Sequence, residues 1–401
     1  MTAAAPRVGP AAPPVERPAA PPRLPLRLEH LDGLRALAAW FVVVHHIWLD
    51  VYPGFPDNRG PWITGWLRWG HLAVAVFIVL SGFSLALSPA RNGDRLTDGH
   101  RRFIARRAWR LLPPYWVALA VSCVVVAFVT GRHSGVVVDA KAVIVHALLL
   151  QDVIDSAKPN GAFWSIAVEW QIYFTFLPLL WLTRRTGPRA MAALTTVLVV
   201  GAYLLGSNVT AFEKLLHVTP QFLALFAMGV AAAQLASRRP SPLAVVRRRW
   251  AAAAAALVAA GAAMLTVAPS AAIVEQFFWV DLGAGLVTAV VVYALAVGAL
   301  PRTARALGSR PLAYAGRFSY STYLLHVPII ATVALAVREL TASADLRLLL
   351  NLAVALPLVF VLTRAFSAAF EQPFVQHRSL RALAAAWARR RASADGAVRY
   401  G

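Results

Sequence analysis

Runs of about twenty apolar residues recur along this chain from Leu34 to Phe370, and they restrict its fold more than any other feature. A run of about this length can cross the hydrocarbon core of a bilayer as a helix. Of the 401 residues, 59% are hydrophobic and only 14% are charged, which is unusual for a soluble domain. The short alternating segments of a β-barrel do not recur in the sequence. The sequence therefore predicts an all-α polytopic membrane protein that is surrounded by a lipid bilayer.

The positive charges between the runs indicate how the predicted helices are oriented. Of the 39 Lys and Arg residues, thirty lie in one set of alternate segments and eight in the other, while Arg364 lies inside the last span. Because cytoplasmic loops carry the excess of positive charge, we predict that both termini are cytoplasmic and that the number of spans is even. The ten predicted spans are approximately 34–51, 71–88, 113–130, 164–183, 189–206, 218–236, 250–268, 277–299, 317–337 and 346–369.

One partly apolar segment does not fit the pattern of a span. Residues 136–151 (VVVDAKAVIVHALLLQ) include Asp139, Lys141 and His146. Counting this segment as a span would invert every later loop and remove the charge asymmetry. We therefore predict one re-entrant or interfacial helix on the outer side, where its backbone contacts protein or water.

The ends of the sequence differ in composition from its middle. Residues 1–30 are rich in Ala, Pro and Arg and are predicted to be a disordered cytoplasmic tail. Residues 31–373 contain all the spans and form the predicted transmembrane domain. Residues 374–401 are predicted to be a basic cytoplasmic tail. The Ala- and Arg-rich, Lys-poor composition is typical of a GC-rich bacterial genome, so we expect a multi-pass protein of a bacterial cell membrane.

The net charge and the cysteine content indicate whether the protein binds nucleic acid or a metal ion. The formal net charge of +21 could indicate a nucleic-acid partner, but the positive residues follow the loops of one membrane side, so we expect no nucleic acid. The single cysteine, Cys123, lies in an apolar run. A disulfide within the chain and a cysteine metal cluster are therefore excluded, and no metal is expected.

Arg35, His46 and Glu169 are ionisable side chains inside the predicted spans, where such groups are costly and usually functional. The stretch LDGLRALAAWFVVVHH contains Arg35 and, eleven residues later, His46, at a distance of about 16 Å along a helix. Glu169 in the fourth span is predicted at the same depth as His46. We therefore predict that the Glu169 carboxylate pairs with His46 and orients it as a general base. The alternative is a structural polar contact between helices.

A second candidate site lies toward the cytoplasmic side, in the run RRAWRLLPPYW. Arg107 and Arg110 are three residues apart and so share one face of a helix. The forked donors of paired arginines suit phosphate groups. The alternative is the ordinary positive charge of a cytoplasmic loop.

Three more polar side chains in the spans are candidates for a cavity or an oxyanion site. Ser81 and Gly82 interrupt the second span, so Ser81 is a candidate oxyanion donor, whereas Gly82 suits close helix packing. His326 either lines a cavity or bonds to a neighbouring helix. Asp281 lies near the outer end of the eighth span, where it either meets a polar acceptor or closes a polar contact.

Several motifs in this order resemble those of the membrane-bound acyltransferase-3 family, the ten-span proteins that O-acylate sugars, glycans and some antibiotics. Arg35 and His46 are in register with its Arg/Lys-x10-His signature. The chain departs from the family pattern at Trp170, where the family has a second glutamate. The other matching motifs are FIVLSGF (77–83), the RxxR pair at 107–110, FWSIAVEWQIY (163–173), YSTYLLHVP (320–328) and FEQP (370–373).

The resemblance implies an acyl-CoA donor that binds from the cytoplasm as a substrate, and acetyl-CoA is the first candidate. It implies no tightly bound cofactor. Arg35, Arg107 and Arg110 would serve the CoA phosphates, and His46, assisted by Glu169, would act as the general base. The acceptor would carry a hydroxyl group, as in a glycan or a lipid-linked sugar. O-acylation of a macrolide-type antibiotic or another secondary metabolite is the alternative.

Two functions other than acyl transfer also agree with the sequence, that of a transporter and that of a scaffold. Intramembrane His, Glu and Arg can relay protons in a proton-coupled transporter. Such transporters usually show repeated halves, which this sequence does not evidently have. A scaffold that assembles envelope enzymes would tolerate the loss of Arg35, His46 and Glu169 together.

Overall fold

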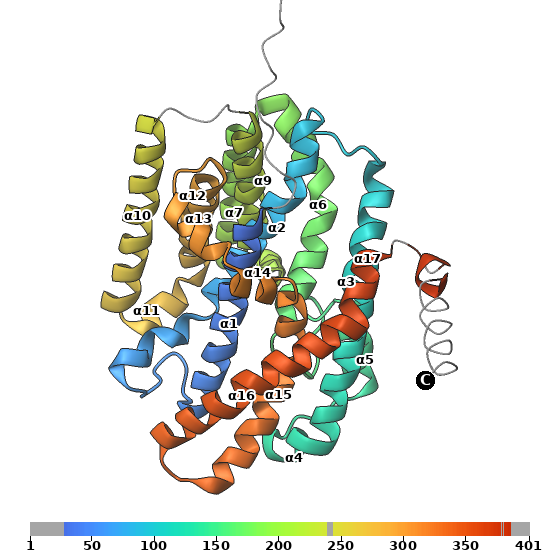
Figure 1. Cartoon of the computed structure of the whole chain (residues 1–401), viewed down its shortest axis with the longest axis vertical. Coiled ribbons are helices and arrows are strands. Elements are labelled where there is room, and N and C mark those ends of the chain that lie inside the picture. Colours follow the sequence, from blue (N-terminus) through green and yellow to red (C-terminus); the bar gives the residue numbers. More distant parts are fainter. Residues whose placement is uncertain (1–27, 239–243, 378, 380, 386–401) are drawn as a thin grey trace, which may run out of the picture.

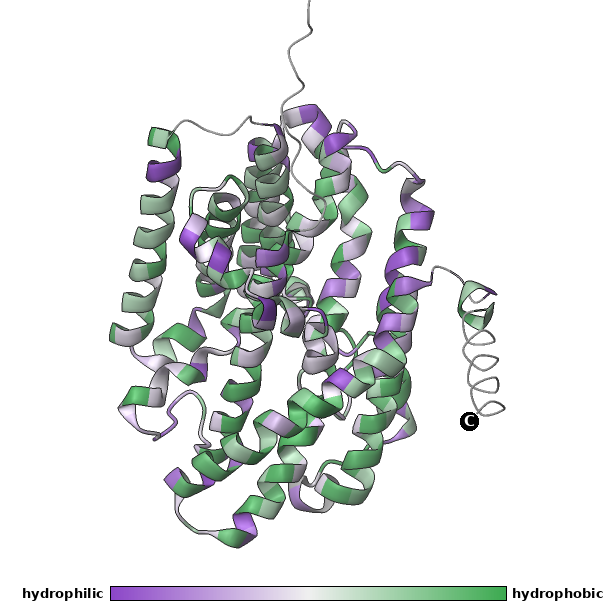
Figure 2. Ribbon diagram, in the orientation of Figure 1, coloured by the Kyte–Doolittle hydropathy of each residue, from purple (hydrophilic) through white to green (hydrophobic). Residues whose placement is uncertain are grey.

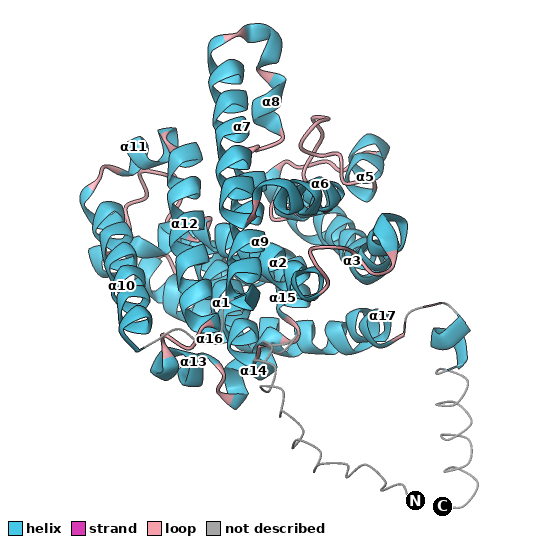
Figure 3. Ribbon diagram, turned by 90° about the horizontal axis from the view of Figure 1, so that it is seen from above, coloured by secondary structure: helices cyan, strands magenta, loops and turns pink. Residues whose placement is uncertain are grey.

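The computed structural model of the protein describes residues 28–238, 244–377, 379 and 381–385. In this part of the chain every regular element is a helix, and no strand occurs (Figure 3). Nine helices among the described residues are long and apolar enough to cross a membrane, which confirms the prediction of an all-α polytopic membrane protein. The predicted tail 1–30 lies outside the described residues up to residue 27, and so do residues 378, 380 and 386–401 of the basic tail.

The helices agree with the predicted spans to within a few residues at most ends. The sixth predicted span, 218–236, corresponds to α9, an 18-residue helix with thirteen buried residues that is not among these nine. The long helices are α1 (Glu29–Val51), α2 (Leu72–Arg91), α3 (Gly99–Val125), α6 (Trp164–Thr186), α7 (Pro188–Asn208), α9 (Gln221–Arg238), α10 (Ala244–Val267), α12 (Phe277–Ala296), α15 (Ser319–Leu340) and α16 (Ala344–Phe366).

Short elements connect or extend these long helices (Figure 1). Two π-helical turns continue α3 and α16, and the second leads into α17 in the FEQP motif. The short elements are η1 (Trp62–Trp69), η2 (Val126–Thr130), α4 (Gly131–Ser134), α5 (Ala140–Ala147), η3 (Thr210–Phe212), α8 (Lys214–His217), α11 (Ser270–Glu275), α13 (Pro301–Leu307), α14 (Arg310–Gly316), η4 (Ser367–Glu371) and α17 (Gln372–Gln376).

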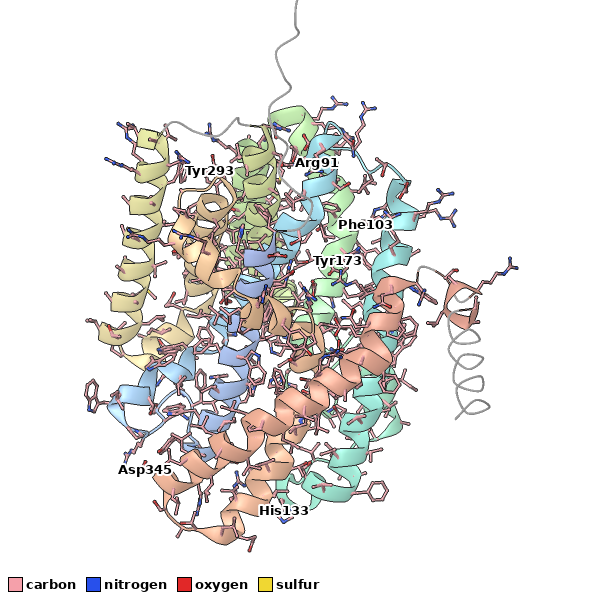
Figure 4. The ribbon with its side chains drawn as sticks, in the orientation of Figure 1. Arg91, Phe103, His133, Tyr173, Tyr293 and Asp345 are labelled. Atoms are coloured by element: carbon pink, nitrogen blue, oxygen red, sulfur yellow. The ribbon has the colours of Figure 1, made fainter. Side chains whose placement is uncertain are left out.

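The two ends of the helix bundle carry different residues. Arg91 lies at one end and His133 and Asp345 lie at the other, so we call these the Arg91 end and the Asp345 end (Figure 4). Hydrophobic residues cover most of α10 and α16 (Figure 2). Only Ala254 of α10 is buried within the protein. Faces of this kind are suited to contact with lipid rather than with other helices.

The segment predicted as a re-entrant or interfacial helix forms the short helix α5. The Asp139 side chain caps α5 by accepting a hydrogen bond from the Ala142 backbone N–H at 2.7 Å. Eight residues rise only about 12 Å, so α5 is too short to cross a bilayer. The helix packs against α3, and buried His146 bonds back to the carbonyl of Ala142 at 2.9 Å.

The helices α2 and α9 lie side by side at the centre of the bundle (Figure 3). Two glycines allow their backbones to approach closely. A Cβ atom added to Gly82 would lie 2.2 Å from the carbonyl oxygen of Phe226, and one added to Gly229 would lie 2.1 Å from that of Val79. Small residues permit such contacts between membrane helices, where van der Waals packing drives association. This contact turns the other face of α2, which carries Ser81, toward the candidate site.

Adding a methyl group at this contact should destabilise the protein. We expect Gly82→Ala and Gly229→Ala each to cost about 1–3 kcal/mol, because backbone oxygens cannot move aside as flexible side chains can. Thermal unfolding of the detergent-solubilised protein, followed by tryptophan fluorescence, measures the loss. Gly283→Ala in α12 is the matched control, because a Cβ at Gly283 would meet open space. Equal midpoints for all three variants would show that the close approach is not required.

A half-buried carboxyl group lies in the loop between α5 and α6. The Oδ2 atom of Asp152 is buried and has no hydrogen-bond partner among the described residues. Burial raises the pKa of Asp152 from 3.8 to about 7, and nearby Lys158 opposes the rise. Between these two pH values the folded protein holds a proton that the unfolded chain releases. The contribution of Asp152 to stability is therefore full below about pH 4 and is lost as the pH rises to about 7.

Replacing this carboxyl group should remove the pH dependence. We expect Asp152→Asn to be more stable than the wild type at pH 8 by about 1–2 kcal/mol, after allowance for its partial exposure, and equal at pH 4. Unfolding midpoints at both pH values test this. Asp155→Asn, at an exposed position in the same loop, is the control and should change neither midpoint. An unchanged pH response in Asp152→Asn would contradict the prediction.

Candidate active site

A cavity of about 740 Å³ lies between α1, α2, α3, α6 and α15. Its lining residues on α2 run from Leu87 to Val74, which is about 20 Å along the helix. Its volume lies within the range of about 300–1,000 Å³ that is usual for small-molecule sites. Exposed Arg110 and Arg317 line its open part. The cavity could therefore admit a long ligand that enters past arginine side chains.

The three arginines predicted from the sequence all line this cavity. Arg35 is held by Asp32 at 3.0 Å and by the Ser84 hydroxyl at 2.5 Å. In the described part of the chain, Arg107 and Arg110 have no carboxylate within ion-pair distance, and the Nε–H of Arg107 is buried without a partner. A buried donor without a partner is costly, so the Arg107 guanidinium is available for an anionic ligand, and the exposed Arg110 guanidinium lies in the same cavity lining.

Glu169 also lines the cavity, and it makes hydrogen bonds other than the predicted one. Its Oε1 atom accepts hydrogen bonds from Ser81 at 2.8 Å and from Tyr173 at 2.5 Å. The predicted pair of Glu169 with His46 is not formed. Helical rise gave similar depths, but it did not give the directions of the two helices. The helix α6 packs against α3, α7 and α9, whereas α1 packs against α2, α14, α15 and α16.

The hydrogen bond to Glu169 also changes the interpretation of Ser81. Its hydroxyl proton is already donated to a carboxylate, so in this arrangement Ser81 does not offer a free oxyanion donor. Tyr173 and Phe103 lie on the facing helices α6 and α3, with their ring centroids 6.4 Å apart (Figure 4). Glu169, Ser81 and Tyr173 thus form a hydrogen-bonded group midway along the cavity.

His46, which was predicted from the sequence to be the general base, pairs with His326. Their ring centroids are 4.8 Å apart and their planes meet at 70°. The Nδ1 atom of His46 lies 2.9 Å from the carbonyl oxygen of Val42, and that of His326 lies 2.7 Å from the carbonyl oxygen of Tyr323. A carbonyl oxygen only accepts, so both rings carry their proton on Nδ1 and leave Nε2 as the basic atom.

The two histidines lie just beyond the closed part of the cavity. Tyr320 and Tyr323 of α15 line the cavity, and His326 is the next residue at helical spacing on the same face. The ring centroids of Tyr323 and His326 are 5.5 Å apart. The Tyr323 hydroxyl is bonded to Ser165 at 2.6 Å. Tyr323 therefore separates the cavity from His326, and neither His326 nor His46 lines the cavity.

Asp281 is in a separate polar cluster toward the Asp345 end. This fully buried carboxylate is 2.9 Å from Nε2 of His71 and accepts a hydrogen bond from Gln221 at 3.1 Å. The cluster joins the beginnings of α2, α9 and α12. Asp281 therefore closes a polar contact between helices and does not line the cavity, which is the second of the two roles predicted for it.

Several residues that line the cavity were not predicted from the sequence to do so. Arg317 lies among the positive charges of a loop, so its composition gave no separate signal. Glu371 is buried and accepts hydrogen bonds from Ser321 at 2.5 Å and Ser367 at 2.9 Å. It ends a π-helical turn, an irregularity that is frequent at functional sites but has no sequence signature of its own. Within the described ranges, no group of three or more His, Cys, Asp or Glu is arranged to hold a metal ion.

These features define a polytopic membrane protein that has an enclosed polar site with arginines in its open part. The chain matches the acyltransferase-3 profile, described as an acyltransferase domain, over residues 28–371. Because this match covers most of the 401 residues, the chain belongs to the acyltransferase-3 family.

Two curated relatives indicate the kind of enzyme found among similar chains. O-acetyltransferase OatA of Staphylococcus aureus (strain NCTC 8325 / PS 47) is 24% identical over 336 residues, which are 77% of this chain and 51% of OatA. Acyltransferase MdmB of Streptomyces mycarofaciens is 32% identical over 163 residues, which are 39% of this chain and 40% of MdmB. The chain therefore spans about half the length of OatA. No solved structure matches this chain.

Proposed function

We propose that this protein is a membrane O-acyltransferase that moves an acyl group from cytoplasmic acyl-CoA to a hydroxyl group of a carbohydrate-type acceptor. One observation carries the proposal: a long cavity has unpaired arginines in its open part and ends one helical turn from a pair of basic histidines. Membership of the acyltransferase-3 family and the similarity to an O-acetyltransferase support the same reaction class.

The shape and charge of the cavity suit CoA. Its phosphates would bind Arg107 and Arg110, with Arg317 nearby, through charge-assisted hydrogen bonds. The pantetheine arm would extend along α2 past the hydrogen-bonded group of Glu169, Ser81 and Tyr173. The thioester would then lie in the part of the cavity lined by Val74, Phe77 and Tyr323. Acetyl-CoA is the donor that we expect first.

The histidine pair supplies the base. The basic Nε2 atom of His46 would remove the proton from the acceptor hydroxyl while the oxygen attacks the thioester carbonyl. The carbon–sulfur bond then breaks, and the proton on His46 passes to the leaving CoA thiolate. General-base assistance contributes about 10²–10⁴ in rate, and the positioning of both substrates contributes much of the rest. For the thioester to meet His46, the Tyr323 side chain has to move aside.

The acceptor is proposed from the class of the relatives. A hydroxyl of a glycan or lipid-linked sugar, reached at the Asp345 end from outside a bacterial cell membrane, agrees with the similarity to an O-acetyltransferase. O-acylation of a macrolide-type antibiotic is the alternative acceptor class. A proton-coupled transporter would use the same polar residues without consuming a thioester, so release of free CoA separates the two classes.

His46→Ala should abolish transfer. With protein in lipid nanodiscs, acetyl-CoA and a chito-oligosaccharide acceptor, we expect the release of free CoA and the acetylation of the sugar to fall at least about 100-fold. A thiol reagent and mass spectrometry measure the two products. His133→Ala is the control, because His133 is exposed and lies at the Asp345 end. Normal acetylation by His46→Ala would refute the proposed base, and gradient-driven solute uptake without CoA release would identify a transporter.

Arg107→Ala should weaken the binding of the donor. Loss of hydrogen bonds to a phosphate group should raise the KM for acetyl-CoA about 10- to 100-fold with a smaller change in kcat. Arg106→Ala is the matched control, because Arg106 is on the same helix and pairs with Asp98 at 2.5 Å instead of lining the cavity. Equal KM values for the two variants would argue against CoA phosphates at this site.

A further inference from the structure

We propose that His326 is the positioning residue that holds and stabilises the proton on His46 during acyl transfer. This inference rests on the proposed function and assigns to His326 the role that the sequence analysis gave to Glu169. The carboxylate of Glu169 is bonded to Ser81 and Tyr173, whereas the ring of His326 lies against His46. Among the described residues, the aromatic rings that contact His46 are those of His45 and His326.

The hydrogen bonding of His326 supports this role. Its side chain is fully buried, and its Nδ1–H is donated to the carbonyl oxygen of Tyr323 at 2.7 Å. Its Nε2 atom is buried and accepts no hydrogen bond from the residues that the structure describes. A buried acceptor without a partner is unfavourable, and an apolar side chain would fill the same space without that cost. A histidine at this position is explained if a hydrogen-bond donor reaches its Nε2 atom during the reaction.

That donor appears when His46 takes a proton. Neutral His46 uses its Nδ1–H for the carbonyl of Val42, so its Nε2 atom has no proton to offer. Once Nε2 of His46 is protonated, it becomes a donor, and the unprotonated Nε2 of His326 can accept from it. The rings are 4.8 Å apart between centroids, and the last torsion of a histidine side chain is soft, so a small rotation brings the two edges together. The new hydrogen bond exists only after proton transfer, which is when catalysis requires it.

His45 does not suit this role as well. Its ring centroid lies 4.9 Å from that of His46, but its Nδ1 atom is bonded to the carbonyl of Leu67 at 2.7 Å, in the η1 segment. Its neighbour Gly70 leaves no room beside the ring, because a Cβ there would lie 2.2 Å from the His45 side chain. His45 therefore fastens η1 to α1. The His326 ring, in contrast, contacts both His46 and Tyr323, the residue that closes the cavity.

Two substitutions separate the proposed role from a purely structural one. His326→Asn keeps an amide N–H near the position of Nδ1, which can bond to the Tyr323 carbonyl, but it has no group at the position of Nε2. His326→Gln places an amide oxygen near the position of Nε2 and can accept from protonated His46. We expect kcat to fall on the order of 10- to 100-fold in His326→Asn and to recover to within about 10-fold of the wild type in His326→Gln. The KM for acetyl-CoA should be unchanged in both, because His326 does not line the cavity.

The test uses acetyl-CoA and the chito-oligosaccharide acceptor in nanodiscs, with the unfolding midpoint of each variant measured alongside. If His326→Asn is as active as His326→Gln or more active, the residue is structural and the inference is wrong. The double variant His46→Ala/His326→Asn should lose no more activity than His46→Ala alone, and additive losses would also contradict the inference. Full activity of His46→Ala would instead overturn the proposed function itself. An inactive His46→Ala beside a fully active His326→Asn would overturn only this inference.

Discussion

The close contact of α2 with α9 is the packing interaction on which the candidate site depends. Gly82 and Gly229 let the two backbones approach until a methyl group on either would meet a carbonyl oxygen. Because side chains on successive positions of a helix point about 100° apart, fixing Gly82 against α9 directs Ser81 to the cavity. The same face of α2 carries lining residues over about 20 Å. One helix thus uses one face for packing and another for the site.

Polar groups inside the membrane domain are paired at most positions, and some of the exceptions lie at the site. Asp281 is held by His71 and Gln221, and Glu371 by two serine hydroxyls. In contrast, Nε of Arg107 and Nε2 of His326 are buried without hydrogen-bond partners in the described part of the chain. Nε–H of Arg107 is a donor where the CoA phosphates are proposed to bind. Nε2 of His326 is an acceptor beside His46, the proposed base. Each lacks a group that a substrate or the reaction would supply.

The helices and the cavity arginines could be predicted from the sequence, but the hydrogen-bond and ring partners of the ionisable groups could not. Helix positions follow from long apolar runs, and Arg35, Arg107 and Arg110 follow from their spacing and from the family motifs. The prediction that Glu169 pairs with His46 used depth alone. Depth follows from helical rise, whereas partners depend on which helices are neighbours and how each is rotated, and these are set by contacts such as that of α2 with α9. His326 was predicted as a cavity or structural residue, and its pairing with His46 had no signal in the sequence.

Tyr323 separates the cavity, where the acyl-CoA thioester is proposed to bind, from the histidine pair. An acyl-CoA in the cavity would be open to water through the exposed arginines, whereas the histidine pair lies behind the Tyr323 ring. If the base had free access to the thioester, it could activate water and hydrolyse the donor before an acceptor arrived. A ring held by the Ser165 hydroxyl keeps base and donor apart in this arrangement. Its displacement would bring the two together, so the arrangement favours transfer to an acceptor over loss of the acyl group to water.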